Sequence, residues 1–312
     1  FNQTISADNK LLGATTGDTW YKFILESNIE RDKNDPSVII WDIGNELNFG
    51  VTDSSQYEQY AKNMKSYIEA IDKTRPITVG DNNPNGLQNA NTQEFRNKVS
   101  TVLAKNGEGL AGANYSMGSM AGIHKTHPDW KIIATESASP SNSRGIYNTL
   151  SQYNKTGDYQ CTAYDTNAVS WGNTARESWW YTIKDDFVSG EFIWTGFDSL
   201  GEPTPYSVYP VGVSSFGTID TAGFAKDSFY LYQSQWTSTP MVHLLPTNWD
   251  QWHDGEEVEV WVNTNQPSAE LFLNGESLGK KSFDEKETAY GKKYNETSEK
   301  TQDDKTWGDS TN

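Results

Sequence analysis

Pro36-Ser-Val-Ile-Ile-Trp-Asp-Ile-Gly-Asn-Glu46 starts with a continuous apolar run and ends on two polar residues. The run Pro36–Trp41 is rich in β-branched side chains, which predicts a strand that is buried on both faces. A strand of this kind belongs to a parallel sheet covered by helices. Functional residues of such sheets lie where the strands end, so Glu46 is a candidate for the chemistry.

Apolar runs of strand length alternate with amphipathic stretches on both sides of this segment. A helix is expected before it, over Asp18–Asp32, and another after it, from Ser54 or Ser55 to just before Arg75. Alternating strands and helices indicate an α/β fold with a parallel sheet. Further strands are expected at residues 77–79, 110–115, 131–135 and 191–197, and further helices at 174–187 and 226–236.

The pattern changes at about residue 237. Glu256–Val262 and Ala269–Leu273 alternate with a period of two, and Asn274-Gly275 is a strong signal for a two-residue hairpin. These features predict antiparallel strands with one solvated face. Residues 281–312 mix Lys with Asp and Glu, and we expect a solvated loop there. The predicted domains are therefore residues 1–237 and 238–312.

The composition excludes several classes of function. With 42 acidic and 25 basic side chains the net charge is −17, which argues against a nucleic acid or an anionic membrane as partner. No apolar run is long enough for a membrane span, and the single cysteine, Cys161, excludes a disulfide within this sequence. The aromatic content of 13% fits either sugar-stacking surfaces or large aromatic cores.

Two glutamates follow predicted strands. Glu46 ends the first segment, and Glu136 follows Ile132–Thr135, 90 residues later. Two carboxyl groups at one edge of a sheet suit glycosidic cleavage, in which one protonates the leaving oxygen and the other attacks or activates water. The alternative is an ordinary solvated glutamate at a strand end. His124 and His127 suggest a metal site, but they lie at a polar helix end, and no metal ligands are predicted.

Four ordered segments resemble glycoside hydrolase family 2, which contains β-galactosidases, β-glucuronidases and β-mannosidases. Pro36–Glu46 resembles the acid/base signature, whose Asn-Glu pair closes the fourth barrel strand, and Lys131–Ser139 resembles the nucleophile segment at the seventh. Gly190–Tyr206 resembles the eighth strand and following loop of the bacterial β-galactosidase branch, and Lys226–Trp236 resembles the final barrel helix. The resemblance runs to about residue 283.

The resemblance implies a role for each matching residue. Glu46 would be the general acid/base and Glu136 the nucleophile of a retaining double displacement, while Asn45 would hydrogen-bond the sugar 2-hydroxyl. Tyr115 would donate a hydrogen bond to Glu136, and Trp194 would form the floor under the sugar; both fit barrel packing as the alternative. The chemistry requires no cofactor. In some family members a divalent metal lies near the acid, and its ligands would come from upstream of this sequence.

The fold implied by the resemblance is a (β/α)8 TIM barrel, followed by a truncated, antiparallel, immunoglobulin-like β-sandwich. Only barrel strands four to eight match this sequence, so N-terminal domains and strands one to three are expected upstream in the intact protein. Because an incomplete barrel has open sheet edges, we expect residues 1–312 alone to be weakly stable and to show little hydrolysis. A non-catalytic carbohydrate-binding fragment is the alternative to an enzyme.

The substrate class depends on one loop and one absence. The loop Gly201-Glu-Pro-Thr-Pro-Tyr206 favours a β-galactoside, or an oligosaccharide that ends in one. Glucuronidases of the family use an Asn-x-Lys motif beyond the eighth strand, and residues 211–226 contain none. A β-glucuronidase and a β-mannosidase are the alternatives within the family. The acidic, Cys-poor composition favours a bacterial protein that is exported or displayed at the cell surface.

Overall fold

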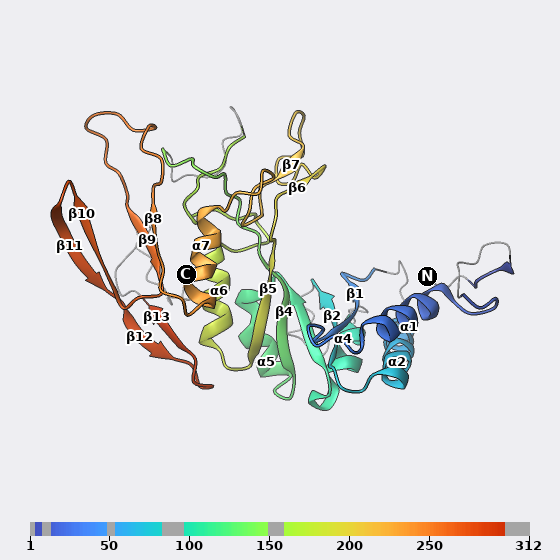
Figure 1. Ribbon diagram of the computed structural model, residues 1–312. Coiled ribbons are helices and arrows are strands. Elements are labelled where there is room, and N and C mark those ends of the chain that lie inside the picture. Colours follow the sequence, from blue (N-terminus) through green and yellow to red (C-terminus); the bar gives the residue numbers. More distant parts are fainter. Residues whose placement is uncertain (1–3, 8–13, 49–53, 83–96, 149–158, 297–312) are drawn as a thin grey trace. The chain divides into compact units, whose positions relative to one another are not determined.

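The computed structural model describes residues 4–7, 14–48, 54–82, 97–148 and 159–296 (Figure 1). The chain forms two compact units. The first comprises Phe1–Thr135 and Phe187–Ser189, and the second comprises Glu136–Asp186 and Gly190–Asn312. The predicted domain boundary at residue 237 falls within the second unit and stays a prediction.

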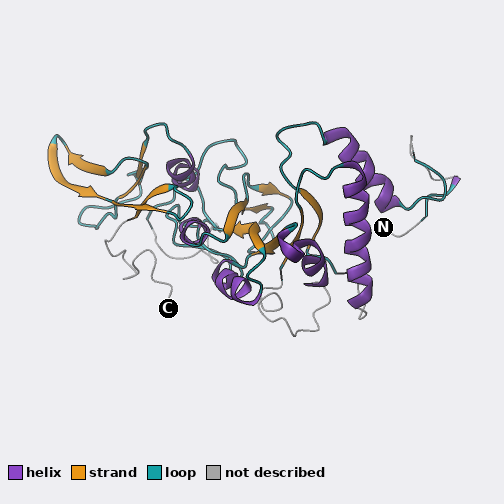
Figure 2. Ribbon diagram, turned by 90° about the horizontal axis from the view of Figure 1, so that it is seen from below, coloured by secondary structure: helices purple, strands orange, loops and turns teal. Residues whose placement is uncertain are grey.

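The first unit is built from strands and helices in alternation, as the sequence predicts. Strand β1 pairs in parallel with β2, and β2 pairs in parallel with β3. Helices and strands of the unit are distinguished by colour in Figure 2. The elements are α1 (Trp20–Asp32), β1 (Trp41–Asn45), α2 (Ser54–Ile71), β2 (Ile77–Asp81), α4 (Asn97–Ala104), β3 (Leu110–Asn114), α5 (Met120–Thr126) and the first part of β4 (Lys131–Ala138), with short 3-10 helices at Lys105–Gly107 and Met117–Ser119.

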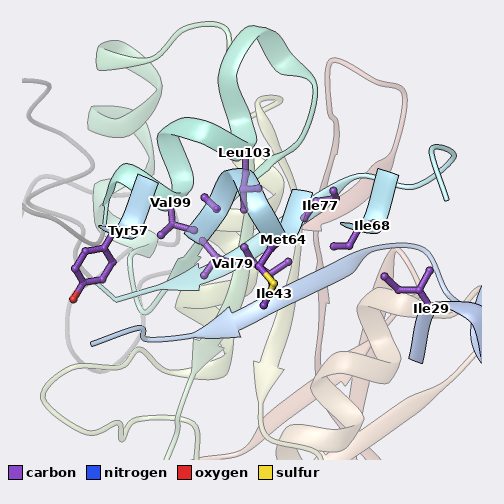
Figure 3. Packing of buried hydrophobic residues seen from close by; sticks show 10 residues of the cluster. Ile29, Ile43, Tyr57, Met64, Ile68, Ile77, Val79, Val99 and Leu103 are labelled. Atoms are coloured by element: carbon purple, nitrogen blue, oxygen red, sulfur yellow. The ribbon is translucent and has the colours of Figure 1, made fainter. Parts of the chain in front are cut away.

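Helix α2 supplies one side of the core in this unit. Of the apolar residues at helical spacing along α2, Tyr57, Ala61, Met64 and Ile68 are between 0% and 5% exposed, and Ile71 is half-buried. Figure 3 shows the four buried side chains gathered with residues of β1, β2 and α4. The cluster therefore holds the helix layer against the strands whose ends carry the candidate site. Its buried members are Ile29, Ile43, Tyr57, Ala61, Met64, Ile68, Ile77, Val79, Val99 and Leu103.

The prediction of a buried strand over Pro36–Trp41 is wrong in its placement. Strand β1 begins only at Trp41, and the preceding Ile39 is 62% exposed. The cause is Arg75, whose Nε donates to the carbonyl of Val38 at 2.6 Å and whose Nη2 donates to that of Asp35 at 3.0 Å. The guanidinium thus occupies the carbonyls of Asp35 and Val38, which a neighbouring strand would otherwise use as acceptors. The pairing of β1 with β2 therefore starts after Val38, at Trp41.

Asp72 holds this guanidinium in place. Its carboxylate is 6% exposed and accepts hydrogen bonds from Arg75 Nη1 at 2.7 Å, Trp41 Nε1 at 2.9 Å and the hydroxyl and N–H of Thr74. Burial alone would raise the pKa of Asp72, but these hydrogen bonds outweigh it and hold the pKa well below its ordinary value. The ionised carboxylate therefore stabilises the turn that leads into β1.

The second unit contains the rest of β4 and the elements that follow it. The strand order β1-β2-β3-β4-β5 describes one sheet, and the boundary between the units passes through β4 and β5. Leu231 and Tyr232 of α7 form a buried cluster with Ala175 of α6, against Ile193 of β5. The elements are α6 (Ala175–Lys184), β5 (Val188–Trp194), β6 (Ser199–Leu200), β7 (Val213–Ser214) and α7 (Asp227–Trp236).

Helix α6 begins with its free backbone donors satisfied. The Thr174 hydroxyl accepts from the N–H of Glu177, and the Glu177 carboxylate accepts from the N–H of Thr174, which is a capping box. The buried carboxylate of Asp165 accepts from the N–H groups of Ala175 and Arg176. A negative group at a helix N-terminus is also favoured by the helix dipole. The predicted helix over 174–187 is thus confirmed, with tighter limits.

Lys226, just before α7, is a buried cation that joins three segments. The residue is 2% exposed, and its ammonium donates to Asp198 Oδ1 at 2.7 Å, to the carbonyl of Asn142 at 2.8 Å and to that of Ser215 at 3.1 Å. Asp198 also accepts from the N–H of Gly217. The segment after β4 that contains Asn142 is therefore tied to the segments on either side of β6 and β7.

The C-terminal part of the second unit consists of antiparallel pairs, as predicted. The Asn274-Gly275 hairpin is confirmed, because Leu273 pairs with Glu276 and the two turn residues have φ values of 51° and 90°. Strand β9 begins at Trp261, later than the alternation from Glu256 predicts. The pairs are β8 (Val242–Leu245) with β9 (Trp261–Thr264), β10 (Ser268–Leu273) with β11 (Glu276–Ser282), and β12 (Asp284–Glu287) with β13 (Lys293–Glu296).

The prediction of a loop over residues 281–312 is wrong for its first half. Residues 284–287 and 293–296 form the β12–β13 hairpin. Lys293 faces Glu287 in the register, and its ammonium pairs with Glu285 at 2.6 Å, so opposite charges on paired strands favour the hairpin. Residues 297–312 lie outside the described residues. No helix in the described ranges is long and apolar enough to cross a membrane.

Glu191 of β5 is a half-buried residue of the second unit. Ser137 of β4 donates to its Oε2 at 2.7 Å, and its Oε1 is out of contact with solvent. Burial raises the pKa of Glu191 to about 7, against hydrogen bonds from Ser137 and Thr182 that favour the carboxylate. The folded protein therefore binds a proton at this carboxyl group more tightly than the unfolded chain does.

The first prediction concerns Asp72 at low pH. Its folded pKa lies below the unfolded value of about 3.9, so its stabilisation is present above that pH and is lost as pH falls. Asp72→Asn should cost about 2 kcal/mol of unfolding free energy at pH 7, and the difference should shrink at pH 3. Urea unfolding at both pH values measures it, with the exposed Asp129→Asn as control. A loss equal at pH 7 and pH 3 would contradict the ionic role.

The second prediction concerns Glu191, whose contribution to folding stability should change with pH in the opposite direction to that of Asp72. Its folded pKa exceeds the unfolded value of about 4.3, so the folded state binds more protons between these values. Stability should therefore fall as pH rises through this interval, and Glu191→Gln should remove that fall. Relative to wild type, the variant should gain on the order of 2 kcal/mol between pH 5 and pH 8.5 in urea unfolding. Glu276→Gln, on the exposed strand β11, should leave the pH dependence unchanged.

Candidate active site

Glu46 lies immediately after β1, where the pairing of β1 with β2 places it at a strand end. Asn45 is level with Gly80 of β2, and the N–H of Glu46 donates to the Gly80 carbonyl at 2.8 Å. Glu46 has a φ of 46°, in the left-handed region that residues other than glycine seldom adopt. Its side chain is half-buried and that of Asn45 is exposed. A strained backbone held by a hydrogen bond at a strand end is typical of functional positions.

Asn114, the last residue of β3, joins this strand end to its neighbours. Its Nδ2 donates to Asn45 Oδ1 at 2.9 Å and to Glu46 Oε1 at 3.1 Å. Its Oδ1 accepts from the Thr135 hydroxyl of β4 at 2.6 Å. Asn114 is only 1% exposed, and it joins the exposed Asn45 and the half-buried Glu46 and Thr135 in one hydrogen-bonded chain at this edge.

Gly80 makes room for these side chains over β2. A Cβ atom at this position would lie 2.4 Å from Asn45 Oδ1, 3.0 Å from Asn114 Oδ1 and 3.3 Å from Asn114 Nδ2. The first of these distances is far below van der Waals contact. Any side chain at position 80 would therefore displace the amide pair that holds Glu46.

The remaining predicted site residues also lie at strand ends. Tyr115 directly follows β3, is half-buried and has a φ of 48°. Glu136 is the sixth residue of β4 and is half-buried. Trp194 is the last residue of β5, and its carbonyl accepts from the N–H of Ser139 at 3.1 Å. Because Glu46 and Tyr115 belong to the first unit and Glu136 and Trp194 to the second, their contacts and the carboxyl separation remain predictions.

Sequence reasoning missed Asn114, Thr135 and Gly80. Two of them adjoin residues that it did select, since Asn114 precedes Tyr115 and Thr135 precedes Glu136. The available signal was a small polar residue at the end of each apolar strand. Gly80 gave a weaker signal, because a glycine within a strand indicates a close approach without saying of what.

The two histidines of the sequence His-Lys-Thr-His are packed against aromatic rings. His124 stacks on Phe187 with ring centroids 4.1 Å apart, and His127 stacks on Trp130 at 3.7 Å. Within the described ranges, no group of three or more His, Cys, Asp or Glu residues could hold a metal ion. The stacking gives these histidines a packing role at the end of α5.

Family models match two parts of the chain. Residues 7–213 match the TIM barrel domain of glycosyl hydrolases family 2, and residues 255–298 match a domain of unknown function. The first match includes Glu46, Glu136 and Trp194, and it ends before α7.

Some similar proteins are named β-galactosidases, and others are named β-glucuronidases. β-Galactosidase BoGH2A of Bacteroides ovatus is 36% identical over 306 residues, covering 85% of this chain and 34% of that protein. A putative β-glucuronidase of Formosa agariphila is 30% identical, with coverage of 86% and 26%. The crystal structure of a β-glycosidase from Bacteroides vulgatus has a TM-score of 0.65 at 31% identity, with coverage of 89% and 35%.

This chain thus spans about a third or less of the length of these relatives. The strands β1 to β5 lie within the match to the barrel domain, and the antiparallel pairs from β8 onwards come after it. The family model covers most of the chain, including both candidate glutamates. The chain therefore belongs to glycosyl hydrolase family 2.

Proposed function

We propose that the protein is a retaining β-galactosidase in which Glu46 is the general acid/base and Glu136 the nucleophile. The observation that carries the proposal is the position of these carboxyl groups, each at or near the end of a strand of the family's barrel domain. The hydrogen bond that Glu46 donates through its N–H and the one that it accepts at its Oε1 support a fixed acid/base. The 36% identity to a named β-galactosidase supports the reaction class.

The proposed reaction has two displacements at the anomeric carbon. In the first, the Glu136 carboxylate attacks and forms a glycosyl ester while Glu46 gives its proton to the departing oxygen. In the second, the Glu46 carboxylate takes a proton from water, which attacks the ester and releases Glu136. This arrangement needs the two carboxyl groups about 5–5.5 Å apart. Formation of the ester removes the charge of Glu136, which favours ionisation of Glu46 for its second task.

The other site residues act on the sugar or on the nucleophile. Asn45, beside Glu46, would bind the 2-hydroxyl, a contact that strengthens as charge develops in the transition state. Tyr115 would donate to Glu136 and favour its ionised form. Trp194 would cover the apolar face of the sugar.

A galactoside is the proposed substrate because the loop 201–206 resembles the β-galactosidase branch, and residues 211–226 contain no Asn-x-Lys triplet. β-Glucuronidase activity is the second candidate, favoured by the 30% identity to a putative β-glucuronidase. Hydrolysis of nitrophenyl β-galactoside and nitrophenyl β-glucuronide by the full-length protein distinguishes the two. The proposal expects the galactoside to be cleaved faster. Faster cleavage of the glucuronide would overturn the proposed specificity.

The third prediction is that the first-formed product keeps the β-configuration. Two successive inversions at the anomeric carbon restore the original stereochemistry. Proton NMR during early hydrolysis of a nitrophenyl β-galactoside should therefore show β-galactose before mutarotation. The Glu136→Gln variant should lose several orders of magnitude in kcat while it still binds the substrate. Initial release of α-galactose would contradict the double-displacement mechanism.

The fourth prediction separates the roles of the two glutamates. Glu46→Ala should be much less damaging for an activated aryl galactoside than for lactose, because a good leaving group needs little protonation. Added azide should restore turnover and yield β-galactosyl azide, since the vacated acid/base side is the face that water uses. The matched comparison is Glu136→Ala with azide. Formation of the α-azide from Glu46→Ala would mean that the two roles are reversed.

A further inference from the structure

The amide of Asn114 has a fixed orientation, and that orientation is decided by its partners. One end of the amide faces Asn45 Oδ1 and Glu46 Oε1, and both of these atoms accept hydrogen bonds when Glu46 is ionised. The NH2 end of Asn114 must therefore face them. Its oxygen then faces Thr135, whose hydroxyl has to be the donor. The hydrogen bonds consequently run in one direction, from Thr135 through Asn114 to Glu46 and Asn45.

The same chain fixes Asn45. Because the Oδ1 of Asn45 accepts from Asn114, its NH2 group is the end of the amide that is not bound to Asn114. Reversal of Asn45 would place its NH2 group against that of the buried Asn114, so Asn114 would lose an acceptor at a cost of about 1 kcal/mol. The side chains pass over β2 only because residue 80 is glycine.

Glu46 is thereby held at two points. Its N–H is bound to the Gly80 carbonyl at 2.8 Å, and its Oε1 is bound to Asn114 at 3.1 Å. An acid that transfers a proton must keep its carboxyl group within hydrogen-bonding reach of the departing oxygen. A half-buried glutamate with only its backbone fixed would still rotate about its side-chain bonds, and the contact to Oε1 limits this rotation.

We propose that Asn114, oriented by the Thr135 hydroxyl, is a positioning residue that holds the Glu46 carboxyl group for proton transfer and turns the donor end of Asn45 towards the substrate. This inference rests on the proposed function, because it assigns Glu46 as the acid. All the residues that carry it belong to the first unit. Thr135 lies one residue before Glu136 in β4, so the strand that bears the nucleophile also orients the acid/base.

The variant that tests this proposal is Thr135→Val in the full-length protein. Valine keeps the shape of threonine but removes the donor, so the Asn114 amide loses the partner that orients it. The readout is kcat/KM for lactose and for 2,4-dinitrophenyl β-galactoside, because only lactose depends strongly on protonation by Glu46. We expect a loss of about 10–100-fold for lactose and less than about 3-fold for the activated substrate.

Three further variants serve as controls. Thr135→Ser restores the hydroxyl donor and should recover most of the lactose activity. Thr78→Val removes a buried hydroxyl of β2 that donates to the Leu110 carbonyl at 3.1 Å, outside this chain of hydrogen bonds, and should affect both substrates alike. Asn114→Ser removes the donor to Glu46 without added bulk, and it should reproduce the selective loss if Thr135→Val fails to fold.

The outcomes separate this inference from the proposed function. Equal losses for lactose and the activated substrate, or no loss for either, would overturn the positioning role while leaving the enzyme assignment intact. If the wild-type protein hydrolyses neither substrate, or Glu46→Ala shows the leaving-group dependence of wild type, the proposed function fails and this inference fails with it.

Discussion

The backbone pairing of β1 with β2 is the interaction on which the described part of the candidate site depends. It sets Asn45 level with Gly80 and gives the N–H of Glu46 its acceptor at the Gly80 carbonyl. The register changes between Asp42 and Asn45, so the polar end of β1 departs from the regular ladder where Glu46 turns into the left-handed region. A shift of one residue would put a side chain other than hydrogen beneath the Asn45–Asn114 pair and break it.

The spacing of apolar residues along the sequence predicted the elements that bury an apolar face. The spacing of Tyr57, Met64 and Ile68 predicts α2 because a helix shows the same face every three to four residues, and that face is indeed buried. The start of β1 was misplaced because the apolar content of Pro36–Trp41 does not reveal the contact with Arg75. Arg75 lies 37 residues after Val38 and donates a hydrogen bond to the Val38 carbonyl. The β12–β13 hairpin was missed because β12 is charged and fully exposed, so no alternation of apolar residues marks it in the sequence.

The candidate site shows the same division. A family resemblance selected Glu46, Glu136 and their polar neighbours, because each stands at a recognisable strand end. Asn114 and Thr135 act through hydrogen bonds between residues that are at least 21 positions apart in the sequence. Contacts of this kind leave no local sequence pattern. Gly80 is informative only once the amides above it are known. Residues that position others are thus harder to predict from sequence than residues that carry charge.

Lys226 makes the segments around Asn142, Asp198 and Ser215 depend on one another. Removing an ammonium from water costs on the order of several kcal/mol, and Asp198 with the carbonyls of Asn142 and Ser215 offsets that cost together. Opening any one segment would leave the charge short of a partner, so these segments should exchange their amide hydrogens as one cooperative unit. Because Cys161 is its single cysteine, this sequence cannot form an internal disulfide. The hydrogen bonds of Lys226 connect three segments without a covalent bond, so a reductant would not break them.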